Sequence, residues 1–103
     1  MKVAVVVQRY GAAINGGAQF PFSEAISFQV MCADQAEVDH YWAALSEGGS
    51  EGRCGWLKDR WGVSWQVVPT ILAELMGDPE RAPRVVQAFL GMTKFDIAAL
   101  LRA

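Results

Sequence analysis

The segment Ala25–Cys32 alternates between two kinds of side chain, as a β-strand with two different faces does. Pro21 precedes it and interrupts any longer backbone ladder. One face carries Phe28, Val30 and Cys32, and the other carries Ser27, Gln29 and Met31. The pattern predicts a strand that buries its first face and presents a more polar second face.

A second alternating stretch begins after the middle of the chain. Strands are predicted over Arg53–Lys58 and Val63–Val68, on either side of Asp59–Gly62, where Asp and Gly suit the ends of a tight turn. In the later strand the two faces are Val63, Trp65 and Val67 against Ser64, Gln66 and Val68. The stretch therefore predicts a β-hairpin with the same asymmetry, which Pro69 ends.

The beginning of the chain also has strand character. Lys2–Tyr10 is rich in β-branched residues and predicts one strand. Gly11 and the cluster Asn15–Gly17 supply turn residues around the short apolar stretch Ala12–Ile14, so a hairpin is the alternative.

Helical spacing of apolar residues follows the strands. Asp34 is predicted to cap a helix over 35–47, with Glu37 three residues later and Gly48–Gly49 as the stop. Three short helices are predicted near the C-terminus: one capped by Thr70 and ending before Gly77, one starting at Asp78–Pro79 and ending at Gly91, and one from Asp96. The predicted fold class is therefore α+β.

Composition places these elements in one domain. The chain has 103 residues, of which 52% are hydrophobic and 19% charged, enough for a core that needs no disulfide. Its formal net charge is −2, and it lacks the basic stripe that a phosphate backbone requires, so we expect no nucleic-acid partner. The longest apolar run, Val3–Val7, is far below the roughly 20 residues of a membrane helix. We expect a cytoplasmic protein that does not bind membranes.

Motifs that carry chemistry are scarce. The sequence contains no GxSxG, P-loop or HExxH motif, and no GxGxxG after a strand, so neither a nucleotide site nor a methyl-donor site of the Rossmann type is indicated. Cys32 and Cys54 lack metal-ligand spacing and are predicted to be small buried hydrophobic side chains, a disulfide between them being the alternative. His40 falls between the apolar positions of its helix and is predicted to be solvated.

The polar strand face is the candidate site. If Phe28, Val30, Trp65 and Val67 pack beneath the helices, the opposite face is lined by Ser27, Gln29, Ser64 and Gln66. Amides and hydroxyls are costly to bury without partners, so this face should meet water, a ligand or the polar face of another subunit. A ligand cavity is one interpretation, and an ordinary solvated sheet face is the other.

Four tryptophans are also candidates for ligand contact. Trp42 and Trp65 lie at positions that fit packing between helix and sheet, which makes them core residues. Trp56 is expected to face the cavity, and Trp61 lies in the predicted turn. Only these last two remain as aromatic ligand contacts.

From Ala12 to its end the chain resembles the PhnB-like branch of the vicinal oxygen chelate superfamily, which includes glyoxalases and bleomycin-resistance proteins. The resemblance rests on INGG (14–17), FSEAISF (22–28), VDHYWAALSEGG (38–49), CGWLKDRWGVSWQVVP (54–69) and FDIAALLRA (95–103). The fourth segment is the most specific. Members of this branch have often been labelled 3-demethylubiquinone-9 3-methyltransferase domains, although no motif in this sequence supports methyl transfer.

The resemblance implies one domain over 1–103, with a βαβββ module over 24–69 and extra C-terminal helices over 70–103. Residues 1–20 would be remnant strands of a shortened leading module. In the superfamily, two modules form a curved sheet around a cavity that often holds a divalent metal. One module cannot close that cavity, so we predict a homodimer whose two-fold axis supplies the missing half.

The resemblance also locates the positions of the metal ligands. They lie at the start of the module's first strand and in its last strand, which are Ser27 and Gln66 here. Neither is a usual ligand of a divalent metal, so we expect no metal and no cofactor. Glu24 would substitute only if the register slips.

The sequence leaves three hypotheses for function. The first is binding of a small polar or aromatic molecule in a cavity at the dimer interface, lined by Asn15, Ser27, Gln29, Trp56, Ser64 and Gln66. Catalysis is not supported, because no general base can be named. The alternatives are a non-enzymatic dimerisation scaffold with a vestigial pocket and a metal-dependent enzyme of the glyoxalase or dioxygenase type.

Overall fold

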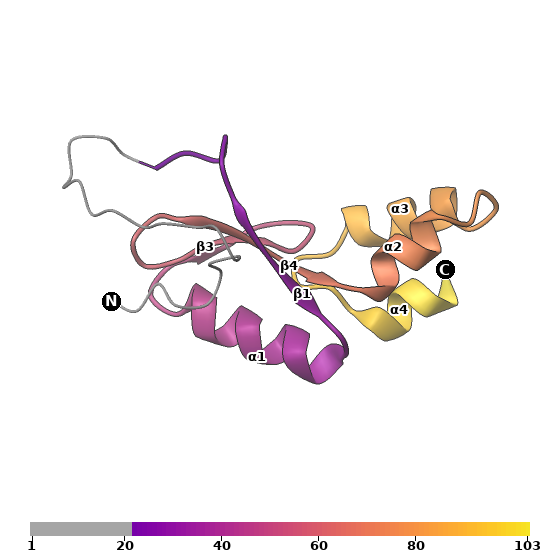
Figure 1. Ribbon diagram of the computed structural model, residues 1–103, viewed down its shortest axis with the longest axis horizontal. Coiled ribbons are helices and arrows are strands. Elements are labelled where there is room, and N and C mark those ends of the chain that lie inside the picture. Colours follow the sequence, from indigo (N-terminus) through magenta and orange to yellow (C-terminus); the bar gives the residue numbers. More distant parts are fainter. Residues whose placement is uncertain (1–21) are drawn as a thin grey trace, which may run out of the picture.

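The computed structural model describes residues 22–103, which form a mixed α+β fold. One helix lies along one side of a four-stranded sheet, and three short helices lie beyond one end of it (Figure 1). The elements are β1 (Phe28–Cys32), α1 (Gln35–Ser46), β2 (Ser50–Glu51), β3 (Trp56–Lys58), β4 (Ser64–Pro69), α2 (Ile71–Met76), α3 (Ala82–Leu90) and α4 (Ile97–Arg102). The predicted α+β class is confirmed, as a four-stranded sheet with several helices. The strands and turns predicted for 1–20 lie outside the described residues.

The sheet has the strand order β1-β4-β3-β2. The predicted hairpin is confirmed, because β3 and β4 pair in antiparallel fashion with Leu57 opposite Trp65. On its other side β4 pairs in parallel with β1, with Val30 opposite Val67. The two-residue strand β2 was not predicted, since two residues show no alternation. The longest strand, β4, therefore has neighbours on both sides and organises the sheet.

The hydrophobic core lies between the sheet and α1. Val67 and Leu57 from the sheet are buried with Val38 and Trp42 from the helix. The Trp42 indole nitrogen donates a hydrogen bond to the Glu51 carboxylate at 2.6 Å, which ties α1 to β2. The prediction that Trp42 and Trp65 are core residues is confirmed.

Phe28 is an exception to the predicted buried face. It is 40% exposed, although its ring packs against Trp65 with centroids 5.4 Å apart. The alternation assigned Phe28 to the correct face, but among the described strands β1 is the outermost in the sheet, and its ring is only partly covered. Its predicted burial was therefore wrong.

The ends of the strands differ from those predicted. β1 begins at Phe28 instead of Ala25, since residues 24–26 form a turn. β3 begins at Trp56 instead of Arg53, because Cys54 and Gly55 adopt φ angles of 57° and 81° that a strand does not accommodate. Alternation of side chains cannot reveal either feature, because it does not report backbone angles.

The turn between β3 and β4 is confirmed, and Asp59 organises it. The Asp59 carboxylate accepts hydrogen bonds from the backbone nitrogens of Trp61 and Val63 at 2.9 and 3.0 Å. It also accepts one from the Trp65 indole nitrogen at 2.9 Å. A single carboxylate thus fixes the turn and one core tryptophan together.

The helix starts were predicted with mixed success. Asp34 caps α1, as predicted, by accepting from the backbone nitrogen of Glu37 at 2.9 Å, and α4 begins at Ile97, next to the predicted start at Asp96. Thr70 does not cap α2 with its side chain, because its backbone is already helical, with φ −61° and ψ −28°. The second C-terminal helix begins at Ala82, not at Asp78–Pro79; Asp78 instead holds a preceding turn.

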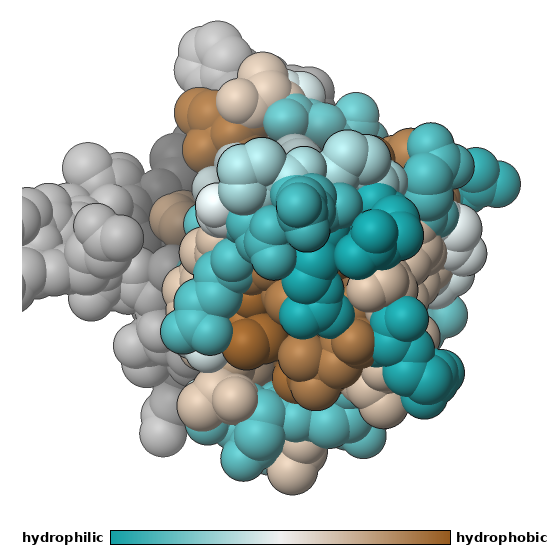
Figure 2. Space-filling view, turned by 90° about the vertical axis from the view of Figure 1, so that its right-hand side faces the viewer, coloured by the Kyte–Doolittle hydropathy of each residue, from teal (hydrophilic) through white to brown (hydrophobic). Residues whose placement is uncertain are grey.

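A glutamine attaches the C-terminal helices to α1. Gln35 donates from Nε2 to the Phe95 carbonyl at 2.9 Å and accepts at Oε1 from the backbone nitrogen of Ile97 at 2.8 Å. The three helices still expose Met76, Leu90 and Leu101. Figure 2, which views the molecule from this end, shows hydrophobic side chains gathered between polar ones.

Both cysteine thiols are free. Cys32 is fully buried, as predicted, and burial is the main cause that raises the pKa of its thiol to about 11, with the charges of Glu37 and Asp34 adding to it. Cys54 is only partly buried, so that prediction was too strong. His40 is exposed, as expected. Within 22–103 no helix has the length and apolar character needed to cross a membrane.

Two glycines with positive φ offer a matched test of how closely the Phe95 ring packs on the backbone before β3. Gly55 (φ 81°) and Gly62 (φ 86°) share the same backbone strain, which costs about 1–2 kcal/mol for a residue with a Cβ. A Cβ at Gly55 would lie 2.5 Å from Phe95 Cε2 and 2.8 Å from the Val67 oxygen, whereas one at Gly62 meets nothing within 4 Å. Urea denaturation should show that Gly55→Ala lowers the free energy of unfolding by roughly 1–3 kcal/mol more than Gly62→Ala. Equal losses would contradict the close approach of the Phe95 ring.

Candidate functional site

The face of the sheet opposite α1, called the open face below, is built by the strand register. Gln66 on β4 lies between Gln29 on β1 and Trp56 on β3. Ser64, two residues earlier on β4, lies opposite Lys58. Because side chains alternate along a strand, these residues share one face while Trp65 and its neighbours in register turn toward the core.

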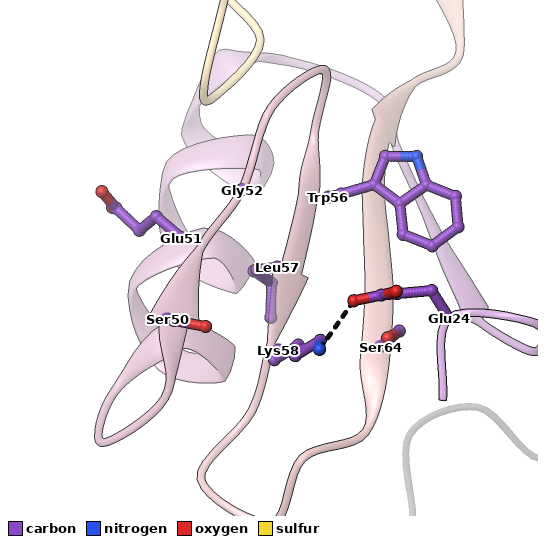
Figure 3. Close-up of a pocket in the computed structure, with 8 residues that line it drawn as sticks. All are labelled: Glu24, Ser50, Glu51, Gly52, Trp56, Leu57, Lys58 and Ser64. Atoms are coloured by element: carbon purple, nitrogen blue, oxygen red, sulfur yellow. Dashed lines mark ion pairs between the residues drawn. The ribbon is translucent and has the colours of Figure 1, made fainter. Parts of the chain in front are cut away.

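The open face contains a hollow of about 260 Å³ near its β2 side. Its walls come from all the strands except β1, together with the turn that precedes β1 (Figure 3). The lining residues are Glu24, Ser50, Glu51, Gly52, Trp56, Leu57, Lys58 and Ser64. The hollow therefore combines an indole, hydroxyl groups and charges of both signs.

An ion pair lies across this hollow. Lys58 Nζ is 2.6 Å from Glu24 Oε1, and both side chains are substantially exposed, at 44% and 65%. The hydrogen bond from Lys58, and then its charge, lower the pKa of the Glu24 carboxyl. Exposed pairs of this kind contribute little to stability, so other charged groups can compete for either partner.

Ser64 is the unusual polar residue of the site. It is only 1% exposed, and its hydroxyl has no hydrogen-bond partner within residues 22–103. Leaving a buried hydroxyl unpaired costs about 1–3 kcal/mol. Ser64 is also among the residues that line the hollow.

The predicted site residues divide into three groups. Trp56 and Ser64 line the hollow. Ser64 is buried, whereas a solvated polar sheet face would expose it. Gln66 donates a hydrogen bond to the Ser27 hydroxyl at 2.8 Å, and these two lie with Gln29 on the same face outside the hollow's lining. Asn15 lies outside the described residues, so its predicted role in the site has no structural account.

Trp61 does not belong to this site. It is exposed in the turn between β3 and β4, where the Arg60 guanidinium lies 5.3 Å from the centre of its ring. It is also absent from the lining of the hollow. Of the two tryptophans proposed as ligand contacts, only Trp56 lies beside the hollow.

Sequence reasoning missed Lys58 and Glu24 as neighbours. A plain tight turn over 59–62 would pair Lys58 with Val63, and the left-handed Gly62 (φ 86°) adds the residue that shifts its partner to Ser64. The position of Glu24 could not be predicted, because it depends on a turn at 24–26, and alternation predicted a strand from Ala25. Sequence reasoning had weighed Glu24 only as a replacement metal ligand.

The described residues do not fit the divalent metal that the resemblance implies. The Ser27 hydroxyl already accepts from Gln66, and the Glu24 carboxylate already pairs with Lys58. Within the described part of the chain, no three His, Cys, Asp or Glu side chains gather closely enough to hold a metal. A hydroxyl and an amide are also poor ligands for the transition metals.

Two serines on this face give a matched test of the unpaired hydroxyl. Ser64→Ala should leave the free energy of unfolding unchanged or raise it by up to about 1 kcal/mol, because it removes a buried group with no protein partner in 22–103. Ser27→Ala should lower it by about 0.5–1.5 kcal/mol, because it breaks the bond with Gln66. Urea denaturation measures both. A larger loss for Ser64→Ala than for Ser27→Ala would show that its hydroxyl is already paired.

Comparison with known proteins places the chain in a family. No curated protein matches the sequence. Among solved structures, a PhnB protein from Bacillus cereus described by the name 3-demethylubiquinone-9 3-methyltransferase is 30% identical, with a TM-score of 0.48. The match covers 52% of this chain and 50% of that one, so the chain spans about half the length of that protein. The model of the family called 3-demethylubiquinone-9 3-methyltransferase matches residues 3–68, well over half of the chain, and the chain therefore belongs to that family.

Proposed function

We propose that this protein belongs to the vicinal oxygen chelate superfamily and binds a small polar or aromatic molecule on its open face, at the interface of a homodimer. The family match and the mixed α+β fold support the superfamily assignment. We assign no catalysis, because both carboxylates that line the hollow are already engaged, Glu24 by Lys58 and Glu51 by the Trp42 indole. The methyltransferase name belongs to the family and is not extended to this chain.

One observation carries the binding proposal. The Ser64 hydroxyl is buried, unpaired within residues 22–103, and part of the wall of a hollow that also contains Trp56 and Lys58. Small-molecule sites typically combine an apolar or aromatic wall with a few polar groups that orient the ligand. A merely solvated sheet face would expose its hydroxyl groups to water, and Ser64 is not exposed.

The open face also supports a second copy as the other wall of the site. It carries the half-buried Trp56 and the exposed Met31, and no helix within 22–103 covers it. A hollow on a single sheet face is open on one side, and a two-fold axis brings an identical face against it. In the vicinal oxygen chelate superfamily, two modules likewise enclose the cavity.

A dimerisation scaffold is the second candidate, and a specific observation favours it. The polar groups of the open face are partly satisfied by one another, through the bond between Gln66 and Ser27 and the pair between Lys58 and Glu24. Such mutual pairing is what a vestigial pocket filled by its own side chains would contain. The two candidates share the dimer and differ in whether a ligand stabilises it.

Light scattering tests the dimer and its location. The unaltered chain should have the mass of a dimer at micromolar concentration, and Gln29→Arg should shift it to monomer by placing a charge in the buried interface. Ala44→Arg, on the exposed surface of α1, should remain dimeric. A monomeric unaltered chain, or a dimer that is insensitive to Gln29→Arg, contradicts an interface through the open face.

A thermal-shift screen separates binding from scaffolding. Divalent metals, small dicarbonyl compounds, phosphonates and aromatic compounds are tested one class at a time, since a ligand that binds only the folded state raises the melting temperature. We expect stabilisation by one class of organic compound and none by metals. Stabilisation by no class favours the scaffold, and stabilisation by a metal favours the metal-dependent enzyme.

A further inference from the structure

Glu24 occupies the hollow as a ligand would. Its carboxylate reaches Lys58 from a turn outside the sheet, and it is the more exposed partner of the pair. Phe22 and Ile26, on either side of it, are strongly exposed, so little packing holds this turn in place. A carboxylate supplied from outside can therefore replace that of Glu24 at the cost of one exposed ion pair.

Two of the hydrogen-bond donors of the hollow, Lys58 and Ser64, lie side by side. Lys58 and Ser64 are direct partners in the antiparallel register of β3 and β4, and both line the hollow. An ammonium and a hydroxyl together suit the two oxygens of a carboxylate, since charged hydrogen bonds of this kind are stronger than neutral ones. The Ser64 hydroxyl, unpaired within the described residues, would gain the acceptor that it lacks.

The other acidic residue of the hollow faces away from this pair of donors. Glu51 accepts a hydrogen bond from the Trp42 indole at 2.6 Å, on the side of the sheet that α1 covers. Figure 3 shows its side chain directed away from Lys58 and Glu24. Among the residues that line the hollow, only the displaceable Glu24 carboxylate therefore stands between an incoming anion and Lys58.

Trp56 selects the body of the ligand that carries the anionic group. It lies two residues before Lys58 on the same strand and face, and its indole forms a wall beside the ion pair (Figure 3). A flat apolar surface next to a cation accommodates a ligand with an acidic end and an apolar or aromatic body. A purely inorganic anion would leave this wall uncovered.

We propose that the hollow binds an organic carboxylate with an aromatic or apolar body, which displaces Glu24 from Lys58, accepts a hydrogen bond from Ser64 and packs on Trp56. Glu24 is then an internal competitor that occupies the anion site until a ligand replaces it. This inference rests on the proposed function and specifies its ligand class.

Binding of benzoate, compared with benzamide and benzylamine, tests the ligand class. The three probes share one ring and differ in charge, and titration of the full chain is followed by the NMR signal of the Trp56 indole NH, assigned with Trp56→Phe. We expect saturable binding of benzoate at least about tenfold tighter than that of benzamide, the factor that corresponds to one charged hydrogen bond. Benzylamine should bind at least about tenfold more weakly than benzoate, because it offers no acceptor to the Lys58 ammonium or the Ser64 hydroxyl.

Variants of the ion pair test the competitor. If Glu24 occupies Lys58 about nine-tenths of the time, Glu24→Gln should tighten benzoate binding about tenfold. Lys58→Met, which keeps the apolar stem, should weaken it at least about tenfold. Glu47→Gln and Arg60→Met alter another exposed ion pair, 3.8 Å apart and outside the hollow, and should leave binding unchanged.

The outcomes separate this inference from the proposed function. Equal binding of benzoate and benzamide with a shift of the Trp56 signal would retain the binding function and overturn the carboxylate and competitor roles. Benzoate binding that Glu24→Gln does not tighten would overturn the competitor role. No shift of the Trp56 signal with any probe would overturn the inference, and the thermal-shift screen would then decide whether the hollow binds another class.

Discussion

The register in which β4 pairs with β1 and β3 decides which side chains are buried and which lie on the open face. Val67 pairs with Val30 on one side of β4, and Trp65 pairs with Leu57 on the other. These pairs place one row of side chains beneath α1 and the next row on the open face. A slip of one residue would exchange the two rows, because side chains alternate along a strand. The buried valines and Trp65 hold the register, and so position Lys58 and Ser64 side by side on the other face.

The sequence predicted the features that depend on periodicity. Alternation assigned Val30 and Val67 to the buried face and Gln29 and Gln66 to the open one, and helical spacing with Asp34 as a cap located α1 within one residue at its C-terminal end. These properties are local and repeat every two or about four residues. A single chain read in isolation is sufficient to recover them.

Features that depend on backbone angles or on distant contacts were not predicted. Cys54 and Gly55 shorten β3 through positive φ angles, which no alternation reports. The burial of Ser64 results from the packing around it, and the contact between Glu24 and Lys58 joins residues more than thirty positions apart. Alternation assigned Trp56 and Ser64 no such contacts, because the ion pair and the unpaired hydroxyl depend on tertiary packing.

The open face combines features that a purely structural surface would not need. It carries an exposed ion pair, an indole and a buried hydroxyl without a partner in the described residues, all around one hollow. A crystal structure of the protein in its solution assembly would decide whether a second copy encloses this hollow. We expect two open faces opposed across a two-fold axis, with Lys58 and Ser64 facing an enclosed cavity. Copies that meet through other surfaces and leave the open face in solvent would contradict this expectation.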